Sequence, residues 1–443
     1  MEKIVSLCKR RGFVFPASEI YGGIGNTYDY GPLGVELLRR VREAWWTATV
    51  TERTDVVGLD SAIIQNPEVW RTSGHVGGFS DPMVDCKKCK ARFRADKLED
   101  ARCPEKPSKR PGTCEGELTE PRAFNLMFKT TIGPVEDSGA IAYLRPETAQ
   151  GIFLNFLNVM NSARTKPPFG IAQIGKSFRN EITPGNFVFR TREFEQAEME
   201  FFVPPAEEQQ WYAYWVKERF EWYTRLGIRA EKLRIRVHDK EELAHYSTGT
   251  SDIEYEYPFG WGELEGIACR TDFDLRRHSE ASGSKLEYFD PQTKEKYTPW
   301  VIEPAGGINR MALTFLIEAF DEEILEDGDV RSVLRFHPRI APITVAVLPL
   351  VKKDGMPEKA LEIGAMLRKA HFTTSYDEKA AIGRRYRRQD EAGTPFCVTI
   401  DGDTLTNDTV TVRHRDSMAQ ERIAVKELRA YIEAQLDTWK RRV

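Results

Sequence analysis

The run GKSFRNEITPGNFVFRTREFEQAEMEFF, residues 175–202, constrains the fold of this chain more than any other stretch. It holds three arginines and five glutamates, and strong strand character extends over residues 171–203. A Pro-Gly turn at Pro184 and Gly185 divides the run, which predicts a β-hairpin. A surface hairpin keeps one apolar face and scatters its charges outward. This hairpin instead indicates the floor of a polar pocket.

The charged residues of this hairpin predict an anion site. Arg179 and Glu181 lie two residues apart, so their side chains share one face of a strand. They could simply pair with each other. A further arginine, Arg310, opens the apolar helix NRMALTFLIEAF, which follows EPAGGI. Glycines permit close backbone approach, and a helix start carries partial positive charge. Two arginines and a helix N-terminus therefore predict a clamp for a triphosphate.

The chain divides into two parts. Its 443 residues are enough for two or three domains. In residues 31–50 an amphipathic helix is expected, with Leu37, Leu38, Val41 and Trp45 on one side, and residues 204–227 predict a long aromatic-rich helix. Residues 81–122 differ from their surroundings in composition and indicate an insertion. A boundary is expected at RFHPRIAP, residues 335–342, where two prolines bracket a short basic link.

Beyond this link the pattern predicts a small α/β domain with a mixed sheet. Strands are expected at 343–350, 372–377, 396–400 and 410–415, and helices at 357–370, 378–393 and 425–439. The second helix carries four arginines. They form either a solvated basic face or a surface that contacts phosphates; they are Arg384, Arg385, Arg387 and Arg388.

Composition indicates a soluble, cytoplasmic protein. The net charge of −4 does not indicate a nucleic-acid binder, although a local basic patch can act as one. The N-terminus MEKIVSLCKRRGFVF lacks the apolar core of a signal peptide, and no stretch approaches the ~20 apolar residues of a membrane helix. Seven cysteines are an odd number, which favours a reducing compartment.

Taken together, these runs resemble the class II aminoacyl-tRNA synthetases. The second motif of that class is matched by Phe178, Arg179 and Glu181, followed after the turn by Arg190 and Phe194. Its third motif is matched by Gly306, Gly307 and Arg310, and its first, a helix and strand at a dimer interface, resembles residues 33–67. Within the class, FRNEITPG, RPETAQGIF, WGELEGIACRTDFDL and RYRRQDEAGTPFCVT are most similar to the glycyl-tRNA synthetases of the homodimeric type. The resemblance covers almost the whole chain.

The resemblance implies an α+β fold. A catalytic domain with an antiparallel sheet and flanking helices is expected at residues 1–336, including the 81–122 insertion, and an anticodon-binding domain with a mixed sheet at 337–443. The implied activity is a glycine–tRNA ligase, which forms glycyl-adenylate from glycine and ATP and then charges the 3′ end of tRNA(Gly). The implied partners are tRNA(Gly) and a second identical subunit, without a membrane.

The resemblance also assigns the site residues. Arg179 would touch the α-phosphate, Glu181 would accept from the adenine amino group, and Phe194 would stack on adenine. Arg190 and Arg310 would reach the rest of the triphosphate, and Glu263 would hold Mg²⁺ that accompanies ATP. The full ATP set is Arg179, Asn180, Glu181, Phe189, Arg190, Thr191, Arg192, Glu193, Phe194, Glu263, Leu264, Gly307 and Arg310.

Glycine offers only an ammonium, a carboxylate and two hydrogens, so tight walls must exclude every side chain. The resemblance implies that Glu147, Glu198 and Glu303 bind the ammonium and that Arg94 approaches the carboxylate. Each glutamate taken alone is typical of an ordinary surface or salt-bridged residue. The full glycine set is Arg94, Glu147, Phe194, Glu195, Gln196, Ala197, Glu198, Glu303, Pro304, Ala305, Gly306 and Gly307.

The chain departs from the family pattern at three places. Ala305 stands where the family usually has serine, and Asn309 stands where the wider class often has an acid. The insertion contains a C-x2-C knuckle at Cys86 and Cys89, but ten residues separate Cys103 from Cys114. These cysteines form either a four-thiolate zinc site or a degenerate ribbon with free thiols.

Two other functions compete with this hypothesis. A sister enzyme for threonine or histidine would need groups that recognise its side chain, and no such motif is found. An accessory subunit that has lost catalysis could keep the fold and the C-terminal domain, but it need not keep the ATP clamp. The joint presence of Arg179, Glu181, Arg190, Phe194 and Arg310 therefore favours the enzyme.

Overall fold

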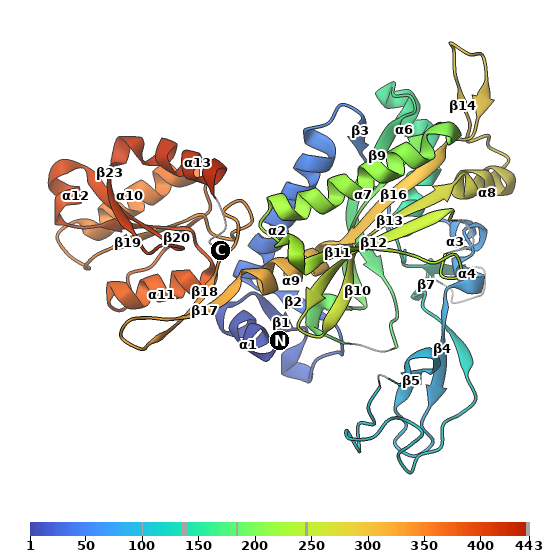
Figure 1. The fold of residues 1–443 in the computed structure, drawn as a ribbon, viewed down its shortest axis with the longest axis horizontal. Helices are drawn as coiled ribbons and strands as arrows, with labels where there is room; N and C mark the ends of the chain where they lie inside the picture. The colour runs from blue at the N-terminus through green and yellow to red at the C-terminus, as the bar shows by residue number, and fades with distance from the viewer. Residues whose placement is uncertain (100, 135–139, 183–184, 244–246, 440–443) are drawn as a thin grey trace.

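A seven-stranded sheet forms the centre of the N-terminal part. The computed structural model describes residues 1–99, 101–134, 140–182, 185–243 and 247–439. In the sheet all neighbouring strands are antiparallel except β3 and β9, which are parallel. The strands, in spatial order, are β11 (Leu233–Val237), β12 (Gly249–Tyr257), β13 (Gly260–Thr271), β16 (Trp300–Gly307), β10 (Glu193–Val203), β9 (Phe169–Phe178) and β3 (Val56–Gly58) (Figure 1).

The predicted hairpin is confirmed as β9 and β10. The two strands pair from Phe178 opposite Glu193 to Phe169 opposite Phe202. Gly185 bridges to Arg190 in the connection, while the expected turn residue Pro184 lies outside the described residues. Because side chains alternate along a strand, β10 has one apolar face and one face that carries carboxylates.

Helices cover both faces of this sheet. On one face α2 (Pro32–Trp46), α7 (Glu208–Arg225) and α9 (Ile308–Ala319) pack over the largest apolar core. On the other lie α5 (Ala149–Leu154), α6 (Phe156–Ala163) and α8 (Phe273–Ser282). The predicted apolar face of the first helix is confirmed, because its four residues are buried. A fully buried side chain of this kind contributes about 1.5–3 kcal/mol. The polar pocket lies on the sheet face beside α5 and α8.

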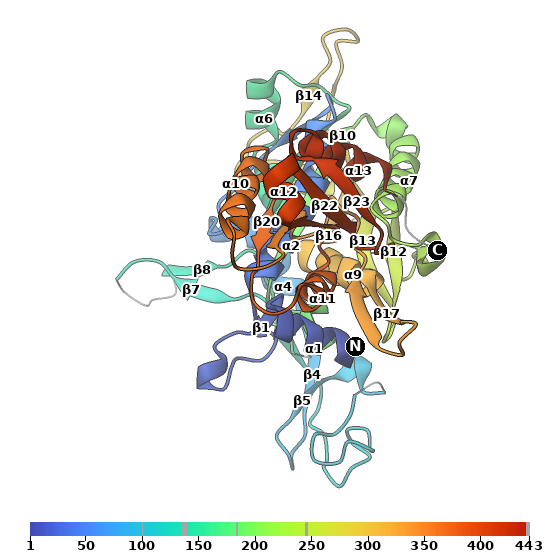
Figure 2. The same cartoon turned by 90° about the vertical axis from the view of Figure 1, so that its left-hand side faces the viewer.

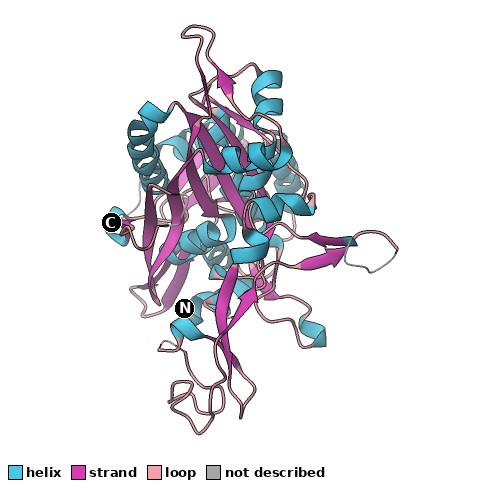
Figure 3. Ribbon diagram, turned by 90° about the vertical axis from the view of Figure 1, so that its right-hand side faces the viewer, coloured by secondary structure: helices cyan, strands magenta, loops and turns pink. Residues whose placement is uncertain are grey.

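The insertion forms a small sheet of its own. Strands β4 (Ser80–Asp85), β5 (Arg92–Arg94) and β6 (Arg122–Asn125) make three antiparallel strands that extend away from the large sheet (Figure 3). The pair β7 (Lys129–Thr131) and β8 (Ile141–Tyr143) projects separately (Figure 2). The remaining short elements are α1 (Glu2–Arg11), β1 (Val14–Pro16), β2 (Tyr28–Tyr30), α3 (Pro67–Thr72), α4 (His75–Gly78), β14 (Tyr288–Phe289) and β15 (Lys296–Tyr297).

The C-terminal part is the predicted α/β domain with a mixed sheet. Its strand order is β20 (Thr374–Tyr376), β19 (Val345–Pro349), β21 (Phe396–Ile400), β22 (Thr409–His414) and β23 (Gln420–Ala424), of which the first three run parallel. Its helices are α10 (Met356–Lys369), α11 (Ile382–Ala392), α12 (Gly402–Asn407) and α13 (Leu428–Thr438) (Figure 2). Strand β23 and helix α12 were not predicted. The strand QERIA is polar and mostly exposed at a sheet edge, and a short helix capped by Asp401 resembles a loop in sequence.

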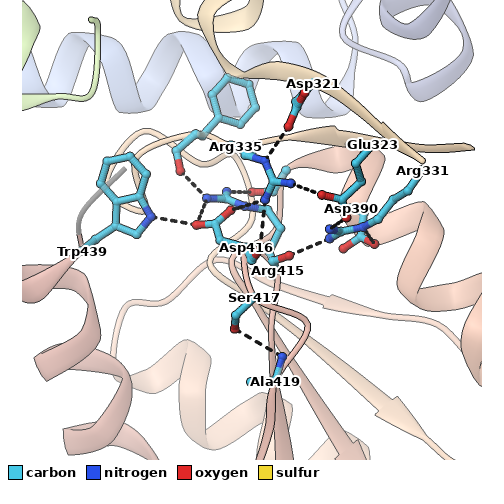
Figure 4. Close-up of polar contacts among 12 residues, drawn as sticks. Asp321, Glu323, Arg331, Arg335, Asp390, Arg415, Asp416, Ser417, Ala419 and Trp439 are labelled. Carbon is cyan, nitrogen blue, oxygen red and sulfur yellow. Dashed lines mark hydrogen bonds and ion pairs between the residues drawn. The ribbon is translucent and has the colours of Figure 1, made fainter. Parts of the chain in front are cut away.

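Buried arginines join the two parts. The hairpin of β17 (Phe320–Ile324) and β18 (Val330–Leu334) leads into the link and contacts α11. Arg331 Nε lies 2.8 Å from Asp390 Oδ2, and its Nη2 donates to the carbonyl of Arg415 at 2.6 Å. Arg335 lies beside them with carboxylates from both parts, as Figure 4 shows. Gly393 is required here, because its φ is +79° and a Cβ would lie 2.4 Å from Phe336.

None of the helices in the described part of the chain combines the length and apolar character that crossing a membrane demands.

Candidate active site

The carboxylate-bearing face of the sheet contains a cavity of about 350 Å³. It lies over β10, β12, β13 and β16, beside the start of α9. Most of the predicted site residues line it. They are Glu147, Arg179, Glu181, Phe189, Arg190, Thr191, Phe194, Gln196, Glu198, Glu263, Glu303, Ala305, Gly306, Gly307 and Arg310.

The guanidinium groups of Arg179, Arg190 and Arg310 lie at one end of this cavity. Arg179 Nε donates to the carbonyl of Pro146 at 3.0 Å, and its guanidinium lies 5.2 Å from the ring centre of Phe194. Arg190 Nη1 lies 3.8 Å from Glu181 Oε2. Each arginine is therefore held by a neighbour, and the cavity between them attracts anions.

Arg310 is the most firmly positioned of the three. It lies in the first turn of α9, its guanidinium lies 4.5 Å from the ring centre of Phe189, and its Nε donates to the carbonyl of that residue at 3.1 Å. Its Nη1 lies 3.1 Å from Glu263 Oε2. This contact holds the pKa of Glu263 below its ordinary value. Gly306 on β16 permits the close approach of Met311 from α9, since a Cβ at position 306 would lie 2.4 Å from Met311 Cε.

The other end of the cavity is acidic. Glu198 accepts the backbone N–H of Thr148 at 3.1 Å and also its hydroxyl. Glu303 pairs with Arg270, whose Nη1 lies 2.5 Å from its Oε2. Glu147 Oε2 lies 3.3 Å from His75 Nε2. The three predicted glutamates thus lie together, although they come from separate segments of the chain.

The same contacts give these three carboxyl groups different pKa values. Burial raises the pKa of Glu198 to about 8, and the charges of Glu303 and Glu147 add to this effect. Burial also raises the pKa of Glu303, although Arg270 opposes the shift. Burial acts on Glu147 in the same direction, but His75 and Arg270 together hold its pKa well below the ordinary value. Glu147 is therefore ionised, and it lies next to Glu198 and Glu303. A bound cation would help these two carboxyl groups to ionise.

Sequence reasoning missed a layer of residues behind these carboxylates. Arg270 on β13 pairs with Asp274 at 2.8 Å as well as with Glu303. Gln150 Nε2 donates to Glu147 and to Asp274, both at 2.9 Å. Arg270 lies within a run already quoted for the family resemblance, but no spacing rule shows which carboxylate it contacts. Glu200, two residues after Glu198 on the same strand face, could have been found from the period of a strand.

Other predicted residues lie away from the cavity wall. Ala197 and Leu264 face the apolar core on the other side of the sheet. Glu195 pairs with Arg42 at 2.8 Å, and its N–H donates to Asn309 Oδ1 at 2.8 Å. Asn180, Arg192, Glu193 and Pro304 are also outside the lining set.

Arg94 does not line the cavity either. It lies on β5 of the insertion, where Nη1 is 2.9 Å from Asp81 Oδ2 and Nη2 is 2.7 Å from Asp96 Oδ2. The insertion thus holds this arginine between two carboxylates of its own.

The four arginines of α11 differ in exposure. Arg385 is buried, and its Nη1 and Nη2 donate to the carbonyls of Pro349 and Leu350 at 2.5 and 3.0 Å. Its role in this position is to stabilise the domain. Arg388 pairs with Asp377 at 2.6 Å, and Arg387 and Arg384 are more accessible.

The four cysteines of the insertion meet around one small cavity, despite the residues that separate them in sequence. Backbone N–H groups beside Cys86 and Cys114 lower the pKa of each thiol, which favours thiolates. Gly116 is needed here, since a Cβ would lie 2.4 Å from Cys86 Sγ. Among the described residues, however, the side chains that bring three possible metal ligand atoms within 4.8 Å of one another are Glu198, Glu200 and Glu303. No three of the four cysteine Sγ atoms lie that close together.

Comparison with known proteins gives two kinds of match. Residues 344–435 match a family described as an anticodon binding domain. The whole chain is similar to curated proteins named glycine–tRNA ligase. It is 55% identical to that of Acetivibrio thermocellus, over 99% of this chain and 98% of the relative. It is 56% identical to that of Treponema denticola, over 100% and 98%, and 56% identical to that of Clostridium beijerinckii, over 99% and 98%.

Proposed function

The chain belongs to the glycine–tRNA ligase family, and on that premise we propose that it activates glycine with ATP and transfers the glycyl group to the 3′ end of tRNA(Gly). The observation that carries the proposal is a single cavity with three guanidinium groups at one end and three glutamates at the other. A triphosphate fits the first end and an amino-acid ammonium fits the second. We assign the chemistry to residues 1–336 and recognition of tRNA to residues 337–443.

At the basic end the residues would neutralise and position ATP. Arg179 contacts the ring of Phe194 and donates to the carbonyl of Pro146, the residue before Glu147, so it suits the α-phosphate, and Phe194 would offer its ring to adenine. Glu181 would accept from the adenine amino group, while Arg190 and Arg310 would bind the outer phosphates. Glu263 lines the cavity beside Arg310 and would hold Mg²⁺, which would offset part of the phosphate charge.

The reaction at the α-phosphate needs no protein base. The glycine carboxylate is already the nucleophile, so catalysis consists of placing it in line with the leaving pyrophosphate and stabilising charge. Glu147, Glu198 and Glu303 would bind the ammonium and fix that direction of approach. Arg94 pairs with Asp81 and Asp96, so it would have to exchange these carboxylates for that of glycine.

Partners follow from the same premise. We propose a homodimer that uses α2 and the preceding loop, where Ile20, Tyr21 and Val35 expose apolar side chains; light scattering on the intact protein tests this.

The accessible arginines Arg384 and Arg387 would contact tRNA phosphates, which binding measurements on their alanine variants test. With all seven cysteines unpaired, we place the protein in the cytoplasm; cell fractionation tests that location.

The proposed activity predicts which amino acid is activated. In ATP–pyrophosphate exchange without tRNA, glycine should support exchange, while alanine, serine, threonine and histidine should not do so appreciably. Binding energy rejects one extra methyl group by only about 1–3 kcal/mol, so alanine is the sharpest comparison. Exchange with another amino acid would indicate a sister enzyme. No exchange in a folded sample that still binds tRNA would indicate an accessory subunit.

We also propose that Cys86, Cys89, Cys103 and Cys114 hold zinc. Soft thiolates suit that ion, and backbone N–H groups stabilise those of Cys86 and Cys114. Protein purified without chelator is expected to contain about one zinc ion per chain, measured by elemental analysis. A Cys86→Ser/Cys103→Ser double variant should lose the metal, and a Cys397→Ser variant, altered in the other domain, should keep it. A background level of zinc in the unaltered protein would dismiss the site.

A further inference from the structure

Glu200 is a buried acid for which the reaction described above has no role. Its side chain lies on β10 and is 0% exposed. Both of its carboxylate oxygens lack a hydrogen-bond partner among the described residues. A buried carboxyl group without partners lowers stability, so its presence here calls for an explanation.

The surroundings of Glu200 place it directly behind the acidic end of the cavity. The register that pairs Glu198 with Ala305 and Phe201 with Ile302 puts Glu200 opposite Glu303 on β16. It shares a strand face with Glu198, two residues earlier. One carboxylate oxygen from each of Glu198, Glu200 and Glu303 lies within 4.8 Å of the other two. Glu200 itself does not line the cavity, so a bound ammonium would contact the other two.

The charged groups around Glu200 are mostly negative, so a proton on Glu200 reduces the repulsion among them. The charged groups that face it are Glu198 on its own strand, Glu303 on β16, Arg270 on β13 and Asp274 on α8. The only cation among these four is Arg270, and its guanidinium already pairs with Asp274 and Glu303. From β9 the neighbour in register is the apolar Ile171. Burial, together with the charge of Glu303, raises the pKa of Glu200 well above its ordinary value.

We propose that Glu200 is a positioning residue: it keeps its proton and donates a hydrogen bond to Glu198 or Glu303, so that these two carboxylates are held ionised and correctly turned towards the substrate ammonium. This inference rests on the proposed function. Within the cluster, Glu198 and Glu303 contact the cation, and Glu200, behind them, acts as a neutral hydrogen-bond donor. A protonated carboxyl group differs from a carboxylate in having one O–H to donate.

Two substitutions of equal length separate this role from the alternatives. Glu200→Gln keeps a donor at the same place, and Glu200→Met removes it while filling the same space. The KM for glycine in ATP–pyrophosphate exchange is expected to stay within about threefold in Glu200→Gln and to rise roughly tenfold or more in Glu200→Met. The KM for ATP should change in neither. The melting temperature of Glu200→Met should be equal or higher, because an apolar side chain replaces a buried polar one.

A matched control is Glu208→Gln. Glu208 is also a buried acid, but it lies on the opposite face of the sheet beside Cys269. Its substitution should leave the KM for glycine unchanged.

Three results would overturn the proposal. A Glu200→Met variant with the KM of the unaltered protein would make Glu200 a bystander. A Glu200→Gln variant as impaired as Glu200→Met would show that its negative charge is what matters. Infrared difference spectra give a measurement that does not depend on folding of the methionine variant. The glycine-bound protein should show a protonated-carboxyl band that Glu200→Gln lacks. Absence of that band contradicts the proposal. If the unaltered protein fails to exchange with glycine at all, the proposed function fails first, and this outcome is distinct.

Discussion

Replacing Arg310 by alanine is expected to slow glycyl-adenylate formation by roughly 10²- to 10³-fold, or ~3–4 kcal/mol in the transition state. Arg310 is held at the start of α9 by the ring and carbonyl of Phe189, so its charge is fixed in place before ATP arrives. A preorganised cation in a partly closed cavity stabilises developing phosphate charge without the cost of reorienting water. The expected loss is therefore in the rate of exchange rather than in folding.

ATP–pyrophosphate exchange with glycine measures this loss, and thermal unfolding checks the fold. Arg276→Ala is the matched control, because Arg276 is an exposed arginine on α8 outside the cavity lining. Arg310→Lys should recover only part of the rate, since an ammonium cannot reproduce the planar contacts of a guanidinium with Phe189 and with phosphate oxygens. Near-normal exchange in Arg310→Ala would mean that the triphosphate does not bind at this end of the cavity.

Replacing Asp390 by alanine is expected to destabilise the junction of the two parts by about 3–5 kcal/mol. Asp390 is 0% exposed. Its Oδ2 lies 2.8 Å from Arg331 Nε, and its Oδ1 lies 2.9 Å from Arg413 Nη1. Arg331, which Figure 4 shows beside Asp390, comes from the hairpin before the link. Arg413 comes from the C-terminal sheet, so one carboxylate joins both parts. Its loss leaves two buried guanidinium groups without this partner.

Thermal unfolding of the intact chain measures the effect, together with two activities. The cavity lies in the N-terminal part, so exchange with glycine should fall much less than charging of tRNA(Gly), which needs both parts in register. Asp403→Asn, an exposed acid in the same domain, is the control and should leave both activities and the melting temperature unchanged. Equal loss of both activities, or an unaltered melting temperature in Asp390→Ala, would contradict a role for Asp390 in fixing the domains.

Much of the local structure could be predicted because it depends on residues close together in sequence. The strand character of residues 171–203 and the Pro-Gly turn within them indicated β9 and β10, and the spacing of Leu37, Leu38, Val41 and Trp45 indicated α2. The polar strand β23 was missed because its stability comes from pairing with β22 rather than from an apolar pattern. The same holds for the acidic end of the cavity, where Arg270 and Asp274 meet Glu303 only after the sheet has formed.

By itself the sequence determined the strand and helix types, the run of residues that carries the arginines, and the family to which they belong. Only the tertiary structure decided which charges became available to a ligand. Arg384 and Arg385 are neighbours in one basic run, yet one is exposed and the other donates to buried carbonyls. Glu198 and Glu200 share a strand face, yet one lines the cavity and the other lies behind it. The physical reason is that exposure and charge balance depend on neighbours brought together from distant segments, which local patterns do not record.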